Sequence, residues 1–146
     1  MNRSPPIPER FTLVTGANRG LGSFYVDALV AAGASKVYAG ARTPSSVKNS
    51  HAVPIELDIT NIAQVEAAAS TCRDVTLLIN NAGILMNSPM LVENSPSAMR
   101  KEFDVNVFGT LNMISAFTNP CRQWRPGDRE HVIDHELDHL AVYRHV

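Results

Sequence analysis

Near the start of the chain, a glycine-rich turn joins an apolar strand to an amphipathic helix. The strand-forming run covers residues 11–15, and apolar residues recur at helical spacing over residues 21–32. Between them, Gly16, Gly20 and Gly22 have the spacing Gly-x-x-x-Gly-x-Gly. Glycines permit a sharp turn and close backbone approach, and a helix N-terminus attracts anions. This junction therefore predicts a phosphate-binding turn at the end of a strand.

Strands and helices alternate along the chain that follows. Apolar runs predict further strands at 36–40, 53–57 and 75–79, and helical periodicity predicts helices at 62–72 and 97–118. Such alternation is typical of right-handed βαβ units around a parallel sheet. We therefore expect an α/β fold with a Rossmann-type, doubly wound sheet in the order 3-2-1-4. A ligand would bind at the carboxyl ends of its strands.

The two ends of the chain do not follow this pattern. Residues 1–10 are rich in proline and predict a flexible leader rather than a signal peptide. Residues 11–118 form the expected nucleotide-binding domain. Residues 119–146 read as an atypical tail, because its first part does not supply a fifth apolar strand. We therefore expect an incomplete sheet of about four strands.

Composition excludes several classes of function. The net charge of −1 gives no electrostatic case for binding nucleic acid or an anionic membrane. No run approaches the roughly 18 apolar residues that span a bilayer. The two cysteines, Cys72 and Cys121, are too few for a disulfide scaffold. We expect a cytoplasmic protein with neither nucleic-acid nor membrane partners.

Four segments resemble, in order, the motifs of the short-chain dehydrogenase/reductase family. They are the glycine turn at 15–22, Asp58 after the third predicted strand, the Asn-Asn-Ala-Gly sequence at 80–83, and the helical segment 103–110. The resemblance covers about residues 9–118. It implies a nicotinamide dinucleotide cofactor and the oxidation or reduction of a small-molecule alcohol/carbonyl pair.

The resemblance also implies which residues lie against the cofactor. They are Gly16, Asn18, Arg19, Gly20, Leu21, Gly22, Arg42, Asp58, Ile59, Asn81, Ala82 and Gly83. Asp58 would contact the adenine, although an acid here can also belong to a helix N-cap region. Residues 81–83 would lie against the ribose, although they can also form a simple turn at the end of a strand.

The end of the second predicted strand indicates which cofactor is preferred. An acid there would bind the ribose 2′-hydroxyl of NAD and repel a 2′-phosphate, but the chain has Arg42. A guanidinium can pair with a phosphate through two hydrogen bonds, and Arg19 in the glycine turn is placed to help. We expect NADP, with NAD as the less favoured alternative.

Asn106 is the one residue that matches the family's catalytic set, where it supports a water in a proton relay. It can equally be a structural hydrogen-bonding residue. The family's serine and its Tyr-x-x-x-Lys do not occur here, and Tyr143 is followed by Arg144, His145 and Val146. We expect negligible turnover from this chain. The alternative is a non-catalytic NADP-binding or interaction module, with homo-oligomerisation through the 97–118 helix.

The tail contains a further motif, because residues 135–139 fit His-Glu-x-x-His. On a helix this spacing places two imidazoles on one face for zinc. The segment resembles the metal-binding helix of peptide deformylases, but the surroundings of Cys121 do not match that family. We expect no metal site and keep His135 and His139 as a remote alternative.

A shifted reading frame offers another explanation of the tail. Codons for residues 122–139, read one nucleotide later with allowed third bases, can give GNGGRAIVNMLSIMSWIT. This string resembles the family's glycine turn, apolar fifth strand and serines. A coding sequence with no length change at this point would contradict the hypothesis.

Overall fold

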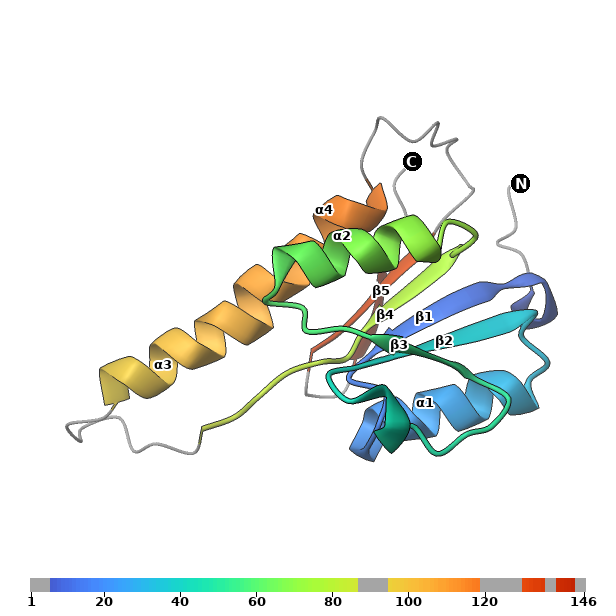
Figure 1. Ribbon diagram of the computed structural model, residues 1–146, viewed down its shortest axis with the longest axis horizontal. Helices are drawn as coiled ribbons and strands as arrows, with labels where there is room; N and C mark the ends of the chain where they lie inside the picture. The colour runs from blue at the N-terminus through green and yellow to red at the C-terminus, as the bar shows by residue number, and fades with distance from the viewer. Residues whose placement is uncertain (1–5, 87–94, 119–129, 136–138, 144–146) are drawn as a thin grey trace.

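The computed structural model describes residues 6–86 and 95–118, together with the backbone of 130–135 and 139–143. Strands and helices alternate along it, as Figure 1 shows. The elements are η1 (Ile7–Glu9), β1 (Phe11–Thr15), α1 (Gly20–Ala31), β2 (Lys36–Ala41), η2 (Pro44–Ser46), β3 (Val53–Glu56), α2 (Ile62–Thr71), β4 (Leu77–Asn80), α3 (Ser95–Phe103), η3 (Asp104–Gly109), α4 (Thr110–Thr118), β5 (Glu130–His135) and β6 (His139–Tyr143).

The sheet has the order β3-β2-β1-β4-β5-β6. Its first five strands are parallel, and β6 runs antiparallel to β5. The predicted order 3-2-1-4 is therefore confirmed. The tail widens the sheet beyond the four strands expected, because β5 pairs with the free edge of β4. Such an edge pairs through backbone groups, so even a segment with Val132-Ile133 as its only apolar pair can add to it.

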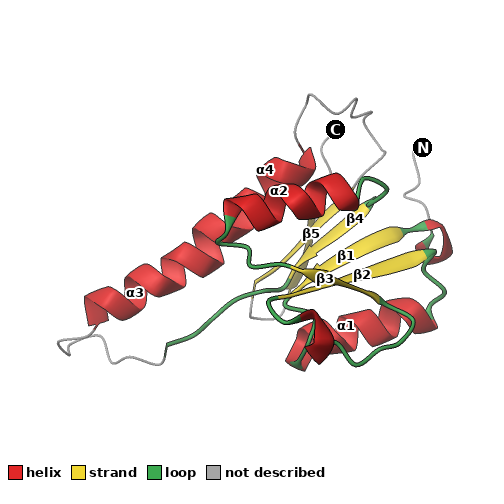
Figure 2. Cartoon of the chain, viewed as in Figure 1, coloured by secondary structure: helices red, strands yellow, loops and turns green. Residues whose placement is uncertain are grey.

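Helices cover both faces of the sheet, with α1 on one side and α2 and α4 on the other (Figure 2). Neighbouring residues of β1 show why both layers form. Leu13 packs into the cluster under α2 and α4, and Val14 packs into the cluster under α1. Both side chains are fully buried. Strands covered on both faces read as continuous apolar runs, which is the pattern that predicted them.

The structure describes a short segment before β1. Residues 7–9 form the short helix η1, and Ile7 packs against the cluster under α1. The Ser35 hydroxyl donates to the carbonyl of Pro8, and Arg10 is 3% exposed. The expectation of a flexible leader over residues 1–10 is thus wrong for its last four residues, because they pack on the domain. Residues 1–5 lie outside the described residues.

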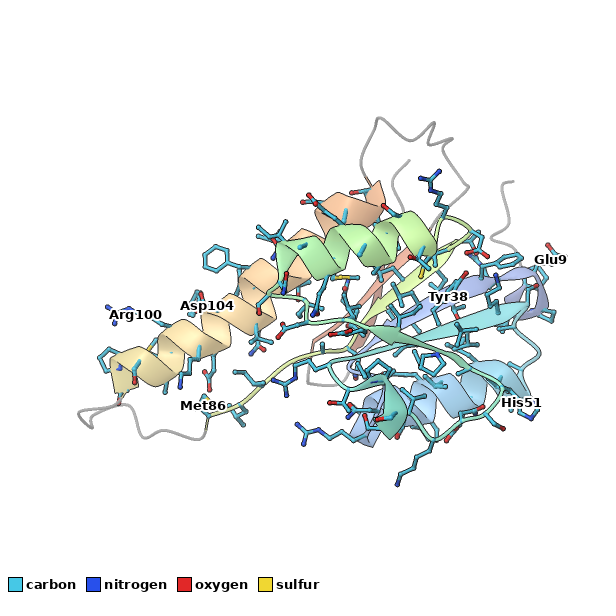
Figure 3. All side chains as sticks on the ribbon, in the orientation of Figure 1. Glu9, Tyr38, His51, Met86, Arg100 and Asp104 are labelled. Carbon is cyan, nitrogen blue, oxygen red and sulfur yellow. The ribbon has the colours of Figure 1, made fainter. Side chains whose placement is uncertain are left out.

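At the amino ends of the strands, Lys36, Tyr38 and Asp74 form a closed triangle of hydrogen bonds. Lys36 Nζ lies 2.6 Å from Asp74 Oδ2 and 3.1 Å from the Tyr38 hydroxyl, which donates to Asp74 Oδ1 at 2.8 Å. Burial acts to raise the pKa of Asp74, but the bonds from Lys36 and Tyr38 outweigh it and leave that pKa lowered. Figure 3 shows Tyr38 at the opposite end of the sheet from Met86, which follows β4.

One continuous helix runs through α3, η3 and α4, and its far end extends away from the sheet (Figure 1). The predicted single helix over 97–118 is present and begins at Ser95. Its centre, η3, is π-helical, a form often found at functional sites. No helix of the described residues is long and apolar enough to cross a membrane.

Candidate functional site

A cleft of about 750 Å³ opens at the carboxyl ends of β1, β2 and β4. Its volume falls in the range of small-molecule sites. The lining comes from four stretches after these strands and β3, at 16–21, 41–43, 57–60 and 80–85, with three residues of the long helix. This is the edge where the parallel sheet was expected to bind a ligand.

The cleft gathers nearly all of the predicted cofactor residues. Those that line it are Gly16, Asn18, Arg19, Gly20, Leu21, Arg42, Asp58, Ile59, Asn81, Ala82 and Gly83, and Asn106 lines it as well. Gly22 does not. Nine further residues line the cleft that were not predicted from the sequence: Ala41, Thr43, Leu57, Thr60, Asn80, Ile84, Leu85, Val105 and Thr110. Most of these flank a motif residue, so proximity in sequence to the motifs was the available signal.

The glycines shape the turn in different ways. Gly16 and Gly20 have φ values of +64° and +54°, which L side chains rarely adopt. Gly22 is needed for space instead. A Cβ on Gly22 would collide with the carbonyl oxygen of Gly16 and lie 2.6 Å from Asn81 Nδ2. Gly22 therefore lets the first turn of α1 lie directly against the backbone after β1.

Thr15 and Asn81 join the two motifs into one unit. The Thr15 hydroxyl accepts from the amides of Asn81 and Ala82, both at 3.0 Å. In return, Asn81 Nδ2 donates to the carbonyls of Thr15 at 2.9 Å and Gly16 at 3.3 Å. The turn after β1 and the turn after β4 thus hold each other in place.

Asp58 lines the cleft, and its surroundings favour the ionised carboxylate. Its Oδ1 accepts from the amide of Thr60 at 2.9 Å and from the Thr60 hydroxyl at 2.7 Å. The hydroxyl bond is the largest cause of a lowered pKa for Asp58, and the charge of Arg42 adds to it against partial burial. The N-cap of α2 is Asn61, and Asp58 binds Thr60 just before it, so Asp58 also belongs to the N-cap region.

Arg19 and Arg42 are both exposed and both border the cleft. Neither guanidinium forms an ion pair or hydrogen bond with a residue in the described part of the chain. Two uncommitted positive charges at one cleft suit an anionic ligand group.

The side chain of Asn106 binds the backbone that leaves β4. Its Oδ1 accepts from the amide of Ile84, and its Nδ2 donates to the carbonyl of Ile84, both at 2.8 Å. Both ends of the amide are used, so Asn106 holds this exit segment against η3. This geometry supports the structural alternative, and Asn106 lies in the cleft as the resemblance implied.

Asn80 contributes an unusual buried group. Its side chain is 5% exposed and lines the cleft, and within the described residues neither Nδ2 nor Oδ1 has a hydrogen-bond partner. A buried amide without a partner is costly. Together with the close-packed glycine turn and the two free guanidiniums, it makes a polar cradle that fits a phosphate-bearing dinucleotide.

The backbone conformation of the tail contradicts the zinc interpretation. His135 ends β5 and His139 begins β6, and the two are partners across an antiparallel pair. They are therefore not one turn apart on a helix, as the metal motif requires. Residues 136–138 lie outside the described residues.

Comparison with known proteins agrees with the motifs. The family model described as short chain dehydrogenase matches residues 10–128. Galactitol 2-dehydrogenase of Agrobacterium fabrum is 30% identical over an alignment of 121 residues that covers 75% of this chain and 46% of that protein. D-erythrulose reductase of Gallus gallus is 34% identical over an alignment of 109 residues that covers 71% of this chain and 44% of that protein. The chain spans about half the length of these relatives.

Solved structures agree as well. A short chain dehydrogenase from Burkholderia cenocepacia J2315, in complex with NADP, matches with a TM-score of 0.74 and 48% identity. The match covers 78% of this chain and 49% of that one. The strand order, the joined turns and the family match thus lead to one conclusion: the chain belongs to the short-chain dehydrogenase family.

Proposed function

We propose that this chain binds NADP(H) in the cleft, as the cofactor-binding part of an oxidoreductase acting on a small-molecule alcohol or carbonyl. One observation carries the choice of cofactor. Arg19 and Arg42 border the cleft and form no hydrogen bond or salt bridge with the described residues, and Arg42 stands where an acid would select NAD. The similar structure from Burkholderia cenocepacia, which contains NADP, supports the same choice.

Each lining segment has a task in this proposal. Amides of the glycine turn and the N-terminus of α1 bind the pyrophosphate, because both present positive dipole ends to an anion. Asp58 faces the adenosine end, and Asn81 to Gly83 lie along the ribose nearer the nicotinamide. When bound, the nicotinamide ring supplies or accepts the hydride. Asn106 acts by holding the segment after β4 at the mouth of the cleft.

Isothermal titration tests the proposal directly. NADPH is expected to bind the 146-residue chain more tightly than NADH. Arg42→Ala removes a charge-assisted phosphate contact worth about 1.5–3 kcal/mol, so it should weaken NADPH roughly ten- to 100-fold. NADH should change little. Equal affinities for the two dinucleotides, or binding of neither, would contradict the proposal.

We also propose that this polypeptide by itself has negligible turnover, because its sequence contains no Tyr-x-x-x-Lys. Loss of a positioned acid or base typically costs about 10²- to 10⁴-fold in rate. The measurement is NADPH oxidation with a panel of small aldehydes and ketones. Rapid oxidation by the purified chain would refute this part.

The long helix supports a second role, as an interaction module between two copies of the chain. It exposes an apolar stripe of Met99, Phe103, Val107 and Leu111, each between 39% and 52% exposed. Exposed contiguous apolar surface marks association sites. Light scattering should show self-association that Val107→Lys weakens. Ile62→Lys is the matched control, because Ile62 is an exposed apolar residue of α2 outside the stripe.

A further inference from the structure

A side-chain hydrogen bond joins the two loops at the rim of the cleft. Asn18, in the glycine turn, donates through Nδ2 to the Ser46 hydroxyl at 3.0 Å across 28 residues of sequence. The Ser46 hydroxyl in turn donates to the carbonyl of Thr43, which lines the cleft. Amide, hydroxyl and carbonyl therefore form a short relay, here called the rim clasp.

Both arginines are next to residues of the rim clasp in the sequence. Arg19 directly follows Asn18, and Arg42 directly precedes Thr43. The backbone of the turn is also tied to β2, where Ala17 donates to Gly40. Beyond the end of β2, the Asn18–Ser46 bond is the only hydrogen bond between these two loops in the described part of the chain.

The position of the clasp has an electrostatic consequence. Two like charges on separate loops repel each other, and the backbone of each loop also loses freedom when its arginine is held at one point. A link between the loops offsets part of both costs before a ligand arrives. A dianionic phosphate that bridges the two guanidiniums gains most from this, whereas a ribose hydroxyl gains little.

We propose that Asn18 and Ser46 are positioning residues for a 2′-phosphate: the rim clasp holds the loops so that Arg19 and Arg42 converge on it. This inference rests on the proposed NADP function and adds which residues set the preference for a 2′-phosphate. The clasp acts through the two arginines.

The experiment uses two probes that differ only in the 2′-phosphate, namely 2′,5′-ADP and 5′-AMP, titrated into the 146-residue chain. Asn18→Ala and Ser46→Ala should each weaken 2′,5′-ADP about two- to tenfold, the size of one neutral hydrogen bond. The double variant should lose no more than either single one, because both break the same link. In Ser46→Ala, binding of 5′-AMP should change less than twofold.

Control variants separate the clasp from a general disturbance of the loop. Ser45→Ala changes the neighbouring, exposed serine of η2 and should leave both probes unaffected. Ser46→Thr keeps a hydroxyl and should retain most of the preference for 2′,5′-ADP, which also covers the case of an unstable Ser46→Ala. Equal loss in Ser46→Thr and Ser46→Ala would overturn the role of the hydroxyl.

The possible failures are distinguishable. A wild-type preference for 2′,5′-ADP that survives Ser46→Ala overturns the clasp and leaves the proposed function standing. Single-variant losses that multiply in the double variant also overturn it, because they indicate two independent contacts with the ligand. A wild-type chain that binds neither probe overturns the proposed function and the clasp together.

Discussion

Replacing Gly22 by alanine tests whether close packing, rather than backbone freedom, fixes the glycine turn. The added Cβ would collide with the carbonyl oxygen of Gly16 and lie 2.8 Å from the carbonyl carbon. Since ordinary contacts begin near 3.4 Å, one backbone must retreat by about 0.6 Å or more. The neighbouring position Gly20 is the matched control, because a Cβ there meets nothing within 4 Å.

The expected cost follows from these contacts. Overpacking against rigid backbone costs about 1–3 kcal/mol. The retreat also weakens the hydrogen bond from Asn81 Nδ2 to the carbonyl of Gly16. Losing this bond would lower the free energy of unfolding further, by about 0.5–1.5 kcal/mol. Gly22→Ala should therefore lower the free energy of unfolding by about 2–4 kcal/mol. Gly20→Ala carries only the left-handed backbone penalty of about 1–2 kcal/mol.

Urea unfolding of both variants measures the difference, and NADPH titration at temperatures where both are folded adds a second readout. Gly22→Ala should also weaken NADPH, because the displaced carbonyl belongs to the glycine turn whose amides are proposed to bind the pyrophosphate. The reasoning is refuted if Gly22→Ala costs less than Gly20→Ala, or if its stability stays within about 0.5 kcal/mol of wild type.

Three further outcomes are expected. Asp74→Asn should destabilise the chain at neutral pH by under about 1 kcal/mol, the scale of an exposed ion pair with Lys36. Because folding lowers the pKa of Asp74, this difference is present above about pH 4 and should fade in urea unfolding at lower pH. Asn106→Leu should cost about 1–3 kcal/mol in urea unfolding by leaving both backbone groups of Ile84 without their partner, and an unchanged midpoint would contradict its structural role. DNA sequencing through the codons for Phe117 to Val146 and beyond should reveal a one-base shift that restores an apolar strand and, downstream, Tyr-x-x-x-Lys; an intact frame would reject the shift.

Local patterns were sufficient to predict the half-sheet and most of the cleft. Strands buried on both faces must be apolar, so β1 and β2 appear in the sequence nearly where they form. The edge strand β3 is mostly exposed, and its short apolar run still placed it within one residue of its observed bounds. The fourth strand was predicted at 75–79 but forms at Leu77–Asn80. Val75 is buried without belonging to the strand, so apolarity alone misplaced the boundary.

Features that depend on distant parts of the chain were not predictable. In α1, Leu21 and Phe24 are exposed, because Gly22, Val26 and Leu29 face the sheet instead. The close approach at Gly22 sets this face, and periodicity alone does not reveal it. The rim clasp spans 28 residues, and β5 depends on the free edge of β4. None of these features can be recognised from a short stretch of the sequence.

The bonds of Thr15 to the backbone after β4 have a kinetic meaning. They join positions 66 and 67 residues apart, and they can form only once β4 has docked beside β1. Closing so long a loop comes late, since its entropy must be lost before the contacts repay it. Nucleotide binding should therefore appear only in the last phase of refolding. A bound ligand that contacts both turns should slow unfolding in proportion to its occupancy. The cofactor would then stabilise β1, β4 and the strands paired with them against unfolding.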